Sequence, residues 1–120
     1  MRDGKYFIDH LPFVPYTGHM RIVQTLVFQN WFDGLRDRQA QKHILVRIGR
    51  LERGLFGDVK PVGEGVSELR IHHGAGYRLY LSRRGDDWVL LLCGGDKDSQ
   101  ARDIVKAKQM AQNLDKETEI

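Results

Sequence analysis

A chain of 120 residues, 41% of them hydrophobic and 29% charged, is long enough for one domain with a modest core and leaves little room for a second. Its net charge of +3 is mildly basic, which alone does not indicate a nucleic-acid partner. No apolar run approaches the roughly 18 residues of a membrane span, and a single cysteine, Cys93, excludes a disulfide within the chain, which favours a reducing cytoplasm.

The two ends of the chain differ from its middle. Residues 1–19 hold two of the three prolines, show no helical or strand period, and lack the basic and apolar regions of a signal peptide. We interpret them as an extension from an upstream start codon or a cloning vector. The alternative is an arm whose large apolar residues pack on the domain or on a partner. The expected domain spans residues 20–114, and residues 115–120 form an acidic tail typical of a solvated terminus.

The first half of the domain is predicted to form one strand and two helices. Residues 21–28 are rich in Val, Ile and Thr, which is typical of a strand. Aromatic and leucine residues then recur at helical spacing and predict a short helix, which Gly34 weakens. A longer helix is expected over residues 38–55, with a basic face opposite an apolar stripe. That stripe comprises Ala40, Ile44, Ile48, Leu51 and Leu55.

The second half is predicted to form three strands and a helix. After a turn-rich connection over residues 57–66, strands are expected at 67–72, 77–82 and 88–93. The last strand is apolar throughout, so it should be central and covered on both faces. The final helix, capped by Ser99 or Asp98, carries apolar residues at spacings of three and four. The order is β-α-α-β-β-β-α, an α+β fold.

Strand alternation predicts a polar face on the sheet. The apolar residues of the strands at 67–72 and 77–82 point to one side, and the other side carries Glu68, Arg70, His72, Arg78 and Tyr80. If the helices cover only the apolar side, the polar side is open. Opposed side chains on antiparallel strands lie ~5 Å apart, close enough for Arg70 and Arg78 to grip one phosphate. The alternative is that both are solvent-facing strand residues paired with a nearby carboxylate, Glu68 or Asp86.

Other candidate ligand-binding residues surround this face. Lys97 and Arg102 follow the central strand, where a turn into a helix commonly presents side chains to a ligand. His72 and His73 titrate near neutrality, and neighbouring arginines favour the neutral form that suits a general base. Tyr80 could donate a proton or stack on a base. The alternative for each is an ordinary surface charge, an exposed turn histidine or a packing tyrosine. No motif for a metal or cofactor is present, so neither is expected.

Three stretches of the sequence carry a family resemblance. GDVKPVGEGVSELRIHHGAGYRLYL, LLLCGGDKDSQARDI and WFDGLRDRQAQKHILVRIGRL resemble the HigB-like addiction module killer branch of the RelE/ParE toxin superfamily. The resemblance covers about residues 20–114, and ELRI, GYR and GGDK occur in the family's order and spacing. It implies a small twisted antiparallel sheet with two N-terminal helices packed on one side and a C-terminal helix.

The resemblance also implies an activity. RelE-like toxins are ribosome-dependent endoribonucleases that cut messenger RNA without a metal: the ribose 2′-OH attacks the adjacent phosphate while basic residues stabilise the developing charge. Carried over to this chain, the catalytic residues would be Arg70, Arg78, Lys97 and His72, and the phosphate-binding residues Arg70, Arg78, Tyr80, Lys97, Arg102 and His73. Two features depart from the family, since no tyrosine follows Tyr80 and Glu68 replaces a basic residue. His72, His73 and Asp96 are therefore the candidates for proton transfer.

Other functions and partners follow from the same resemblance. ParE-like members share the fold but inhibit DNA gyrase and cleave no RNA, and a decayed toxin could survive as a partner-binding module. The expected partners are a cognate helix-turn-helix antitoxin, the ribosome and messenger RNA. Operator DNA would be contacted only through the antitoxin, and no membrane partner is expected.

Overall fold

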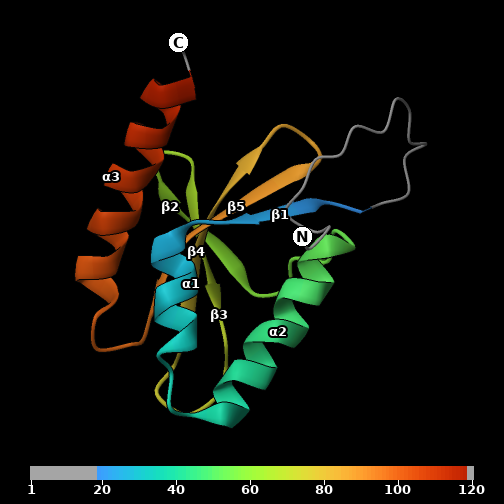
Figure 1. The fold of residues 1–120 in the computed structure, drawn as a ribbon, viewed down its shortest axis with the longest axis vertical. Helices are drawn as coiled ribbons and strands as arrows, with labels where there is room; N and C mark the ends of the chain where they lie inside the picture. Colours follow the sequence, from blue (N-terminus) through green and yellow to red (C-terminus); the bar gives the residue numbers. More distant parts are fainter. Residues whose placement is uncertain (1–18, 119–120) are drawn as a thin grey trace.

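Five strands form one sheet at the centre of the protein (Figure 1). The computed structural model describes residues 19–118, so most of the expected extension over residues 1–19 lies outside the described residues. The strands are β1 (Arg21–Gln24), β2 (Val59–Gly63), β3 (Val66–Arg70), β4 (Arg78–Arg84) and β5 (Trp88–Gly95). Their order is β1-β5-β4-β3-β2. Because β1 runs parallel to β5 and the other pairs are antiparallel, the sheet is mixed, and the expectation of an antiparallel sheet was wrong.

Three helices accompany the sheet: α1 (Leu26–Asp33), α2 (Arg38–Glu52) and α3 (Gln100–Thr118). Thr25 caps α1, since its Oγ1 accepts from Phe28 N at 3.0 Å and donates to Leu92 O of β5 at 2.6 Å. The long helix ends three residues earlier than predicted, because Gly54 adopts a φ of 77° and leaves Leu55 exposed. None of the helices between residues 19 and 118 combines the length and the apolar character that crossing a bilayer requires.

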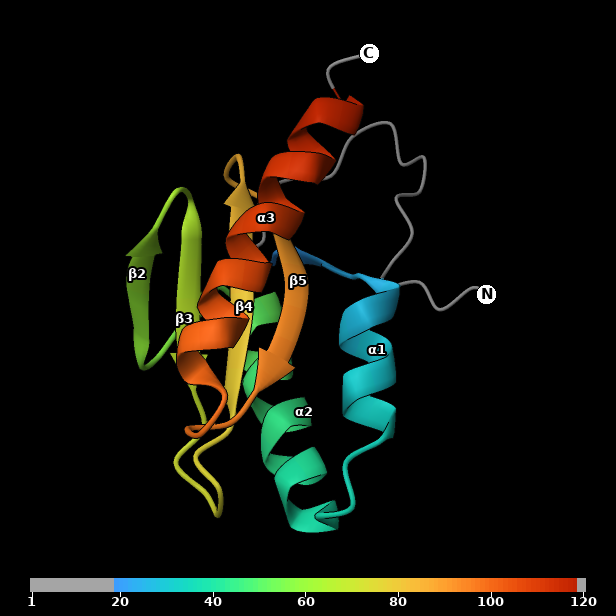
Figure 2. The same ribbon diagram turned by 90° about the vertical axis from the view of Figure 1, so that its left-hand side faces the viewer.

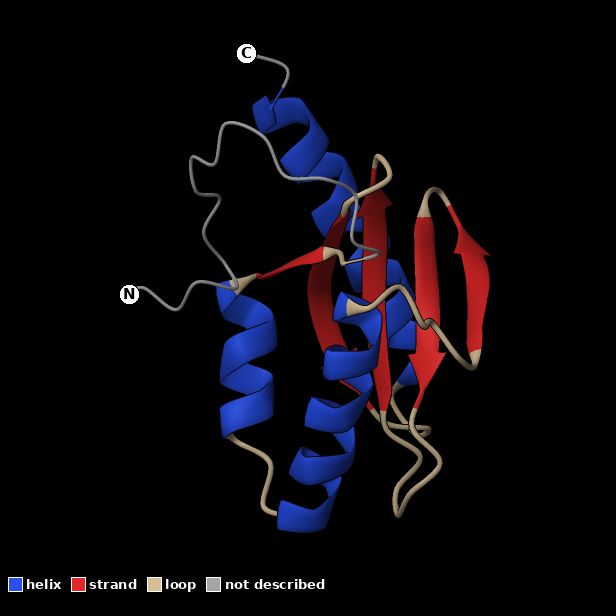
Figure 3. Cartoon of the chain, turned by 90° about the vertical axis from the view of Figure 1, so that its right-hand side faces the viewer, coloured by secondary structure: helices blue, strands red, loops and turns tan. Residues whose placement is uncertain are grey.

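One face of the sheet packs against α1 and α2, as predicted. Figure 3 shows α2 in front of the strands and α1 to the left of them. Arg47 of α2 ties the helix to the end of β3, donating to Arg70 O at 2.6 Å. The core on this face consists of Met20, Ile22, Phe28, Ile44, Ile48, Leu51, Leu69, Ile71, Leu79, Leu81, Val89 and Leu91.

The opposite face packs against α3 (Figure 2). A second, smaller core lies there, made of Val66, Tyr80, Leu92, Cys93, Ala107 and Ala111. The expectation that this face is open and polar was therefore wrong. The small side chains Ala107 and Ala111 let the helix approach the sheet closely. Leu92 and Cys93 both face it because the register between β4 and β5 shifts at Tyr80/Leu81.

The sheet has one strand more than predicted. The turn-rich segment contains β2, an edge strand that pairs with β3 and tolerates Pro61 because an edge strand need not donate from every backbone N–H. The element order is therefore β-α-α-β-β-β-β-α. The prediction that the apolar strand is central and covered on both faces is confirmed, because β5 lies between β1 and β4 and contributes side chains to both cores.

Candidate anion-binding site

A pocket of about 390 Å³ lies at the end of the sheet where the β3–β4 turn meets the loop after β5. It brings together most of the residues that the sequence singles out, which come from two stretches of the chain, residues 70–78 and Lys97. Its lining comprises Arg70, Ile71, His72, His73, Gly74, Gly76, Tyr77, Arg78 and Lys97. Two of the lining residues, His72 and Lys97, are exposed, so the pocket is open to solvent on their side.

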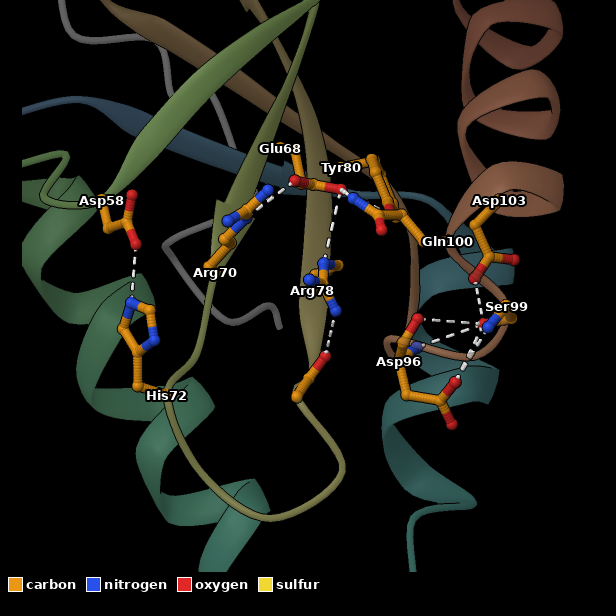
Figure 4. A network of polar contacts seen from close by, with 11 residues as sticks. Asp58, Glu68, Arg70, His72, Arg78, Tyr80, Asp96, Ser99, Gln100 and Asp103 are labelled. Carbon is orange, nitrogen blue, oxygen red and sulfur yellow. Dashed lines mark hydrogen bonds and ion pairs between the residues drawn. The ribbon is translucent and has the colours of Figure 1, made fainter.

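Arg70 and Arg78 stand opposite each other on β3 and β4, as the alternation predicts. Both guanidinium groups converge on one carboxylate, but it belongs to the protein itself (Figure 4). Arg70 Nε donates to Glu68 Oε1 at 3.0 Å, and Arg78 Nε lies 3.5 Å from Glu68 Oε2. The Glu68 side chain is 1% exposed. Of the two alternatives for these arginines, the structure thus contains the pairing with Glu68, on a covered face.

Two neutral donors complete the surroundings of Glu68. Tyr80 Oη donates to Oε2 at 3.0 Å, and Gln100 Nε2, from the first residue of α3, donates to the same oxygen at 2.8 Å. Burial raises the pKa of Glu68, but the hydrogen bonds from Gln100, Arg70 and Tyr80 and the charge of Arg78 outweigh it, so the pKa lies below its ordinary value. Glu68 is therefore a buried anion with each oxygen bound.

Glu68 engages the two arginines at Nε, which leaves part of each guanidinium for a ligand. The Arg70 side chain is 33% exposed, and its Nη atoms make no hydrogen bond to the described residues. Arg78 is more enclosed, with 10% of its side chain exposed and Nη1 donating to Gly76 O at 2.8 Å. Since the carboxylate fixes the direction of both side chains, the terminal nitrogens are held in place before any ligand arrives.

Two neighbouring histidines line the pocket, and each faces an aspartate. His72 Nε2 lies 2.6 Å from Asp58 Oδ2, and the hydrogen bond lowers the pKa of Asp58. His73 Nε2 lies 3.2 Å from Asp37 Oδ2. The pKa of Asp37 is also lowered, first by a hydrogen bond from Ala40 N and then by His73. Neither aspartate lines the pocket.

The GGDK motif brings Lys97 to the pocket because its glycines let both layers of helices approach β5. A Cβ atom on Gly94 would overlap the Trp31 ring of α1, and one on Gly95 would overlap Asp103 at the start of α3. After Gly95 the chain turns, and Lys97 N donates to Ala75 O at 3.2 Å. The β3–β4 turn is thereby held against the loop after β5.

Three of the residues singled out from the sequence lie elsewhere. Tyr80 is fully buried beneath α3, and burial together with its hydrogen bond to Glu68 raises its pKa. The prediction that Tyr80 stacks on a base or donates a proton was therefore wrong. Arg102 is exposed on α3 and does not line the pocket. Asp96 accepts from Ser99 N at 3.1 Å and shapes the turn into α3, where Ser99 precedes the helix as predicted.

Of the residues that orient the others, the sequence pointed to Glu68 as an alternative partner of the arginines but not to Gln100, Asp37 or Asp58. Glu68 pairs with the arginines and accepts from Gln100, while Asp37 and Asp58 face the histidines. A signal for Glu68 was present, since it shares a strand face with Arg70 and lies opposite Tyr80. No signal linked Gln100 or the aspartates to the site. Over residues 19–118, no group of three or more His, Cys, Asp or Glu side chains is arranged to hold a metal ion.

Comparison with known proteins identifies one close relative. An uncharacterised protein of Haemophilus influenzae is 47% identical to this chain over 95 residues, a match that covers 79% of this chain and 96% of that protein. No family model matches the chain.

Proposed function

We propose that this chain, which belongs to the same family as the Haemophilus influenzae protein, is the toxin of a type II toxin–antitoxin module. In this proposal it acts as a ribosome-dependent endoribonuclease on messenger RNA. The observation that carries the proposal is the pocket in which Arg70, Arg78 and Lys97 meet two histidines. The resemblance of the ELRI, GYR and GGDK motifs to RelE-like toxins adds the substrate, and it implies that the reaction needs no metal.

The pocket suits a reaction at a phosphodiester. Attack of a 2′-OH on phosphorus adds negative charge to the phosphoryl oxygens in the transition state, and fixed donors aimed at that charge often supply the largest catalytic contribution. The Nη atoms of Arg70 are such donors, and Lys97 adds an exposed ammonium group to the pocket. Because Glu68 already fixes Arg70, no reorganisation of that side chain is needed when charge develops.

The arrangement of elements is consistent with a RelE-like architecture to which β2 adds an edge strand. In this proposal the protein works in the cytoplasm, its partners are the ribosome, messenger RNA and a helix-turn-helix antitoxin, and it contacts operator DNA through the antitoxin. The antitoxin would neutralise the toxin by covering the pocket or by blocking entry to the ribosome.

One observation favours the ParE-like alternative, a gyrase inhibitor without nuclease activity. Glu68 neutralises part of the positive charge of Arg70 and Arg78, whereas a phosphate clamp would use both guanidinium groups in full. A protein that only binds gyrase needs no such clamp, so the ion pairs would then serve the fold alone.

Induced expression with and without the neighbouring gene distinguishes these functions. The proposal predicts growth arrest and new 5′ ends at fixed codon positions, and both should vanish when translation initiation is blocked. Intact messages with trapped gyrase–DNA complexes would instead identify the ParE-like activity.

A pair of arginine variants tests the pocket itself. Arg70→Ala removes exposed donors and should lower cleavage about 100-fold or more, the usual scale for losing one transition-state donor. Arg102→Ala is the matched control, because Arg102 is exposed but lies outside the pocket lining. Equal cleavage by both variants would contradict the assignment of the pocket.

A further inference from the structure

Only one of the two histidine–aspartate pairs at the pocket is built firmly into the fold. The pair of His72 and Asp58 is open to water, with 72% of the histidine side chain exposed. Exposed pairs of this kind contribute little to stability. The His73 side chain is 27% exposed, and its partner Asp37 is less exposed than Asp58.

Asp37 is held at both of its oxygens. Oδ1 accepts from Ala40 N at 3.0 Å, as the N-cap of α2, and Oδ2 faces His73 Nε2 at 3.2 Å. The ring of His43, also on α2, packs against the His73 ring with centroids 4.6 Å apart. A helix terminus therefore orients the carboxylate, and the carboxylate together with His43 orients the His73 imidazole.

This arrangement determines which nitrogen of His73 can take a proton. When Nε2–H donates to Asp37, the neutral ring carries its lone pair on Nδ1. Nδ1 has no partner within the part of the chain that the structure describes. The charged or titratable groups near the ring are Asp37 and His43, together with Arg78 and Lys97, which line the same pocket.

We infer that His73, oriented by Asp37, is the general base of the proposed endoribonuclease, an inference that rests on the proposed function. In the reaction, the proton of the 2′-OH moves to His73 Nδ1 as the 2′-oxygen forms a bond to phosphorus. The bond from phosphorus to the 5′-oxygen breaks, and the leaving oxygen takes a proton from water. His73 then returns its proton to the solvent, which leaves a 2′,3′-cyclic phosphate and a 5′-hydroxyl end.

Cleavage of message on programmed ribosomes by the full-length protein tests the inference with three variants. His73→Ala should lower the rate constant about 100- to 10,000-fold, the usual range for a general base, while binding to the ribosome and the unfolding midpoint stay near wild type. Added imidazole should restore part of the rate. His19→Ala is the control, because His19 is an exposed histidine outside the pocket lining, and its rate should stay within about threefold of wild type.

Asp37→Asn separates orientation of the base from structural support. Asparagine caps helices as well as aspartate does, so the start of α2 should remain intact. The lost negative charge should shift the limb of the pH–rate profile that reports the base towards lower pH, because the protonated imidazole is then less favoured. An unchanged profile would contradict the orienting role.

The possible failures are distinct. If the wild-type protein cuts no message, the proposed function is wrong. If the wild type cuts but His73→Ala retains its rate, His73 is not the base and the proposed function stands. A slow His73→Ala variant that unfolds more easily and gains nothing from imidazole would show that the pair only fastens the β3–β4 turn to α2.

Discussion

The buried carboxylate of Glu68 provides the most direct test of the site's construction. Glu68→Ala would leave the Arg78 guanidinium, on a side chain only 10% exposed, without an anion. Removing one partner of a buried ion pair typically costs about 3–5 kcal/mol. Arg70 can turn towards water, so it should add little to that cost. Glu68→Gln keeps an acceptor but removes the charge, and we expect a smaller loss of about 1–3 kcal/mol.

Urea unfolding at pH 7 measures this effect. With a slope of about 2 kcal/mol per molar, a loss of about 4 kcal/mol lowers the midpoint by about 2 M. The control is Glu64→Gln, because Glu64 is an exposed residue whose partners are Lys108 and Gln112. A surface contact of this kind contributes roughly 0–1 kcal/mol, so the control midpoint should hardly move.

The pH dependence of stability provides a second, independent readout. Since the pKa of Glu68 is lower in the folded protein, its contribution is complete above the ordinary glutamate pKa and is lost as the pH falls through the folded value. The difference between wild type and Glu68→Gln should therefore be constant from pH 6 to 8 and shrink in acid. A Glu68→Ala protein whose stability lies within about 1 kcal/mol of wild type at pH 7 would refute the reasoning. So would a stability difference between wild type and Glu68→Gln that does not change with pH.

Three further predictions concern the sheet and its covering helices. Leu91→Ala should destabilise the protein by about 2–5 kcal/mol in urea unfolding, because Leu91 is fully buried and the change leaves a cavity; a loss under about 1 kcal/mol would contradict its place in the core. Gly95→Ala should cost about 1–3 kcal/mol, because the added Cβ overlaps Asp103; an unchanged unfolding midpoint would show that α3 can move freely. Burial raises the pKa of Cys93 to about 11, so a thiol reagent at pH 8 should label it only after unfolding, and rapid labelling of the native protein would contradict its burial.

Sequence patterns predicted most elements of the fold but not the way in which the layers combine. The apolar run that became β5 could be placed at the centre of the sheet, because only a strand covered twice is apolar throughout. An amphipathic helix such as α3 must cover some apolar surface, but its own residues do not say which face of the sheet it covers. Because α3 covers the face that carries Tyr80, this tyrosine is a core residue, whereas the sequence predicted a surface residue.

The elements that were missed or extended too far have local causes. The strand β2 contains Pro61, and proline lowers the expectation of a strand although an edge strand accepts it. The spacing that placed Leu55 on the stripe of α2 continues past the true end of the helix, because spacing does not register the left-handed turn at Gly54.

The candidate site could be predicted only where chain neighbours or opposed strand positions define it. Arg70 and Arg78 were found because alternation and register place them opposite each other. Asp37 lies 36 residues from His73, and Gln100 lies 32 residues from Glu68, so these contacts depend on how α2 and α3 dock. The candidate ligand-binding residues and their partner Glu68 could be named from the sequence, whereas Asp37 and Gln100 required the structure.

The position of β1 has a consequence for how the protein is made. Its partner in the sheet is β5, and the hydrogen bond between Thr25 and Leu92 spans 67 residues. Pairings between such distant segments form slowly, because a long loop must close before any contact compensates for the lost entropy. During synthesis the first strand must therefore wait until residues 88–95 have left the ribosome, and a prematurely terminated chain would contain neither the finished sheet nor the pocket.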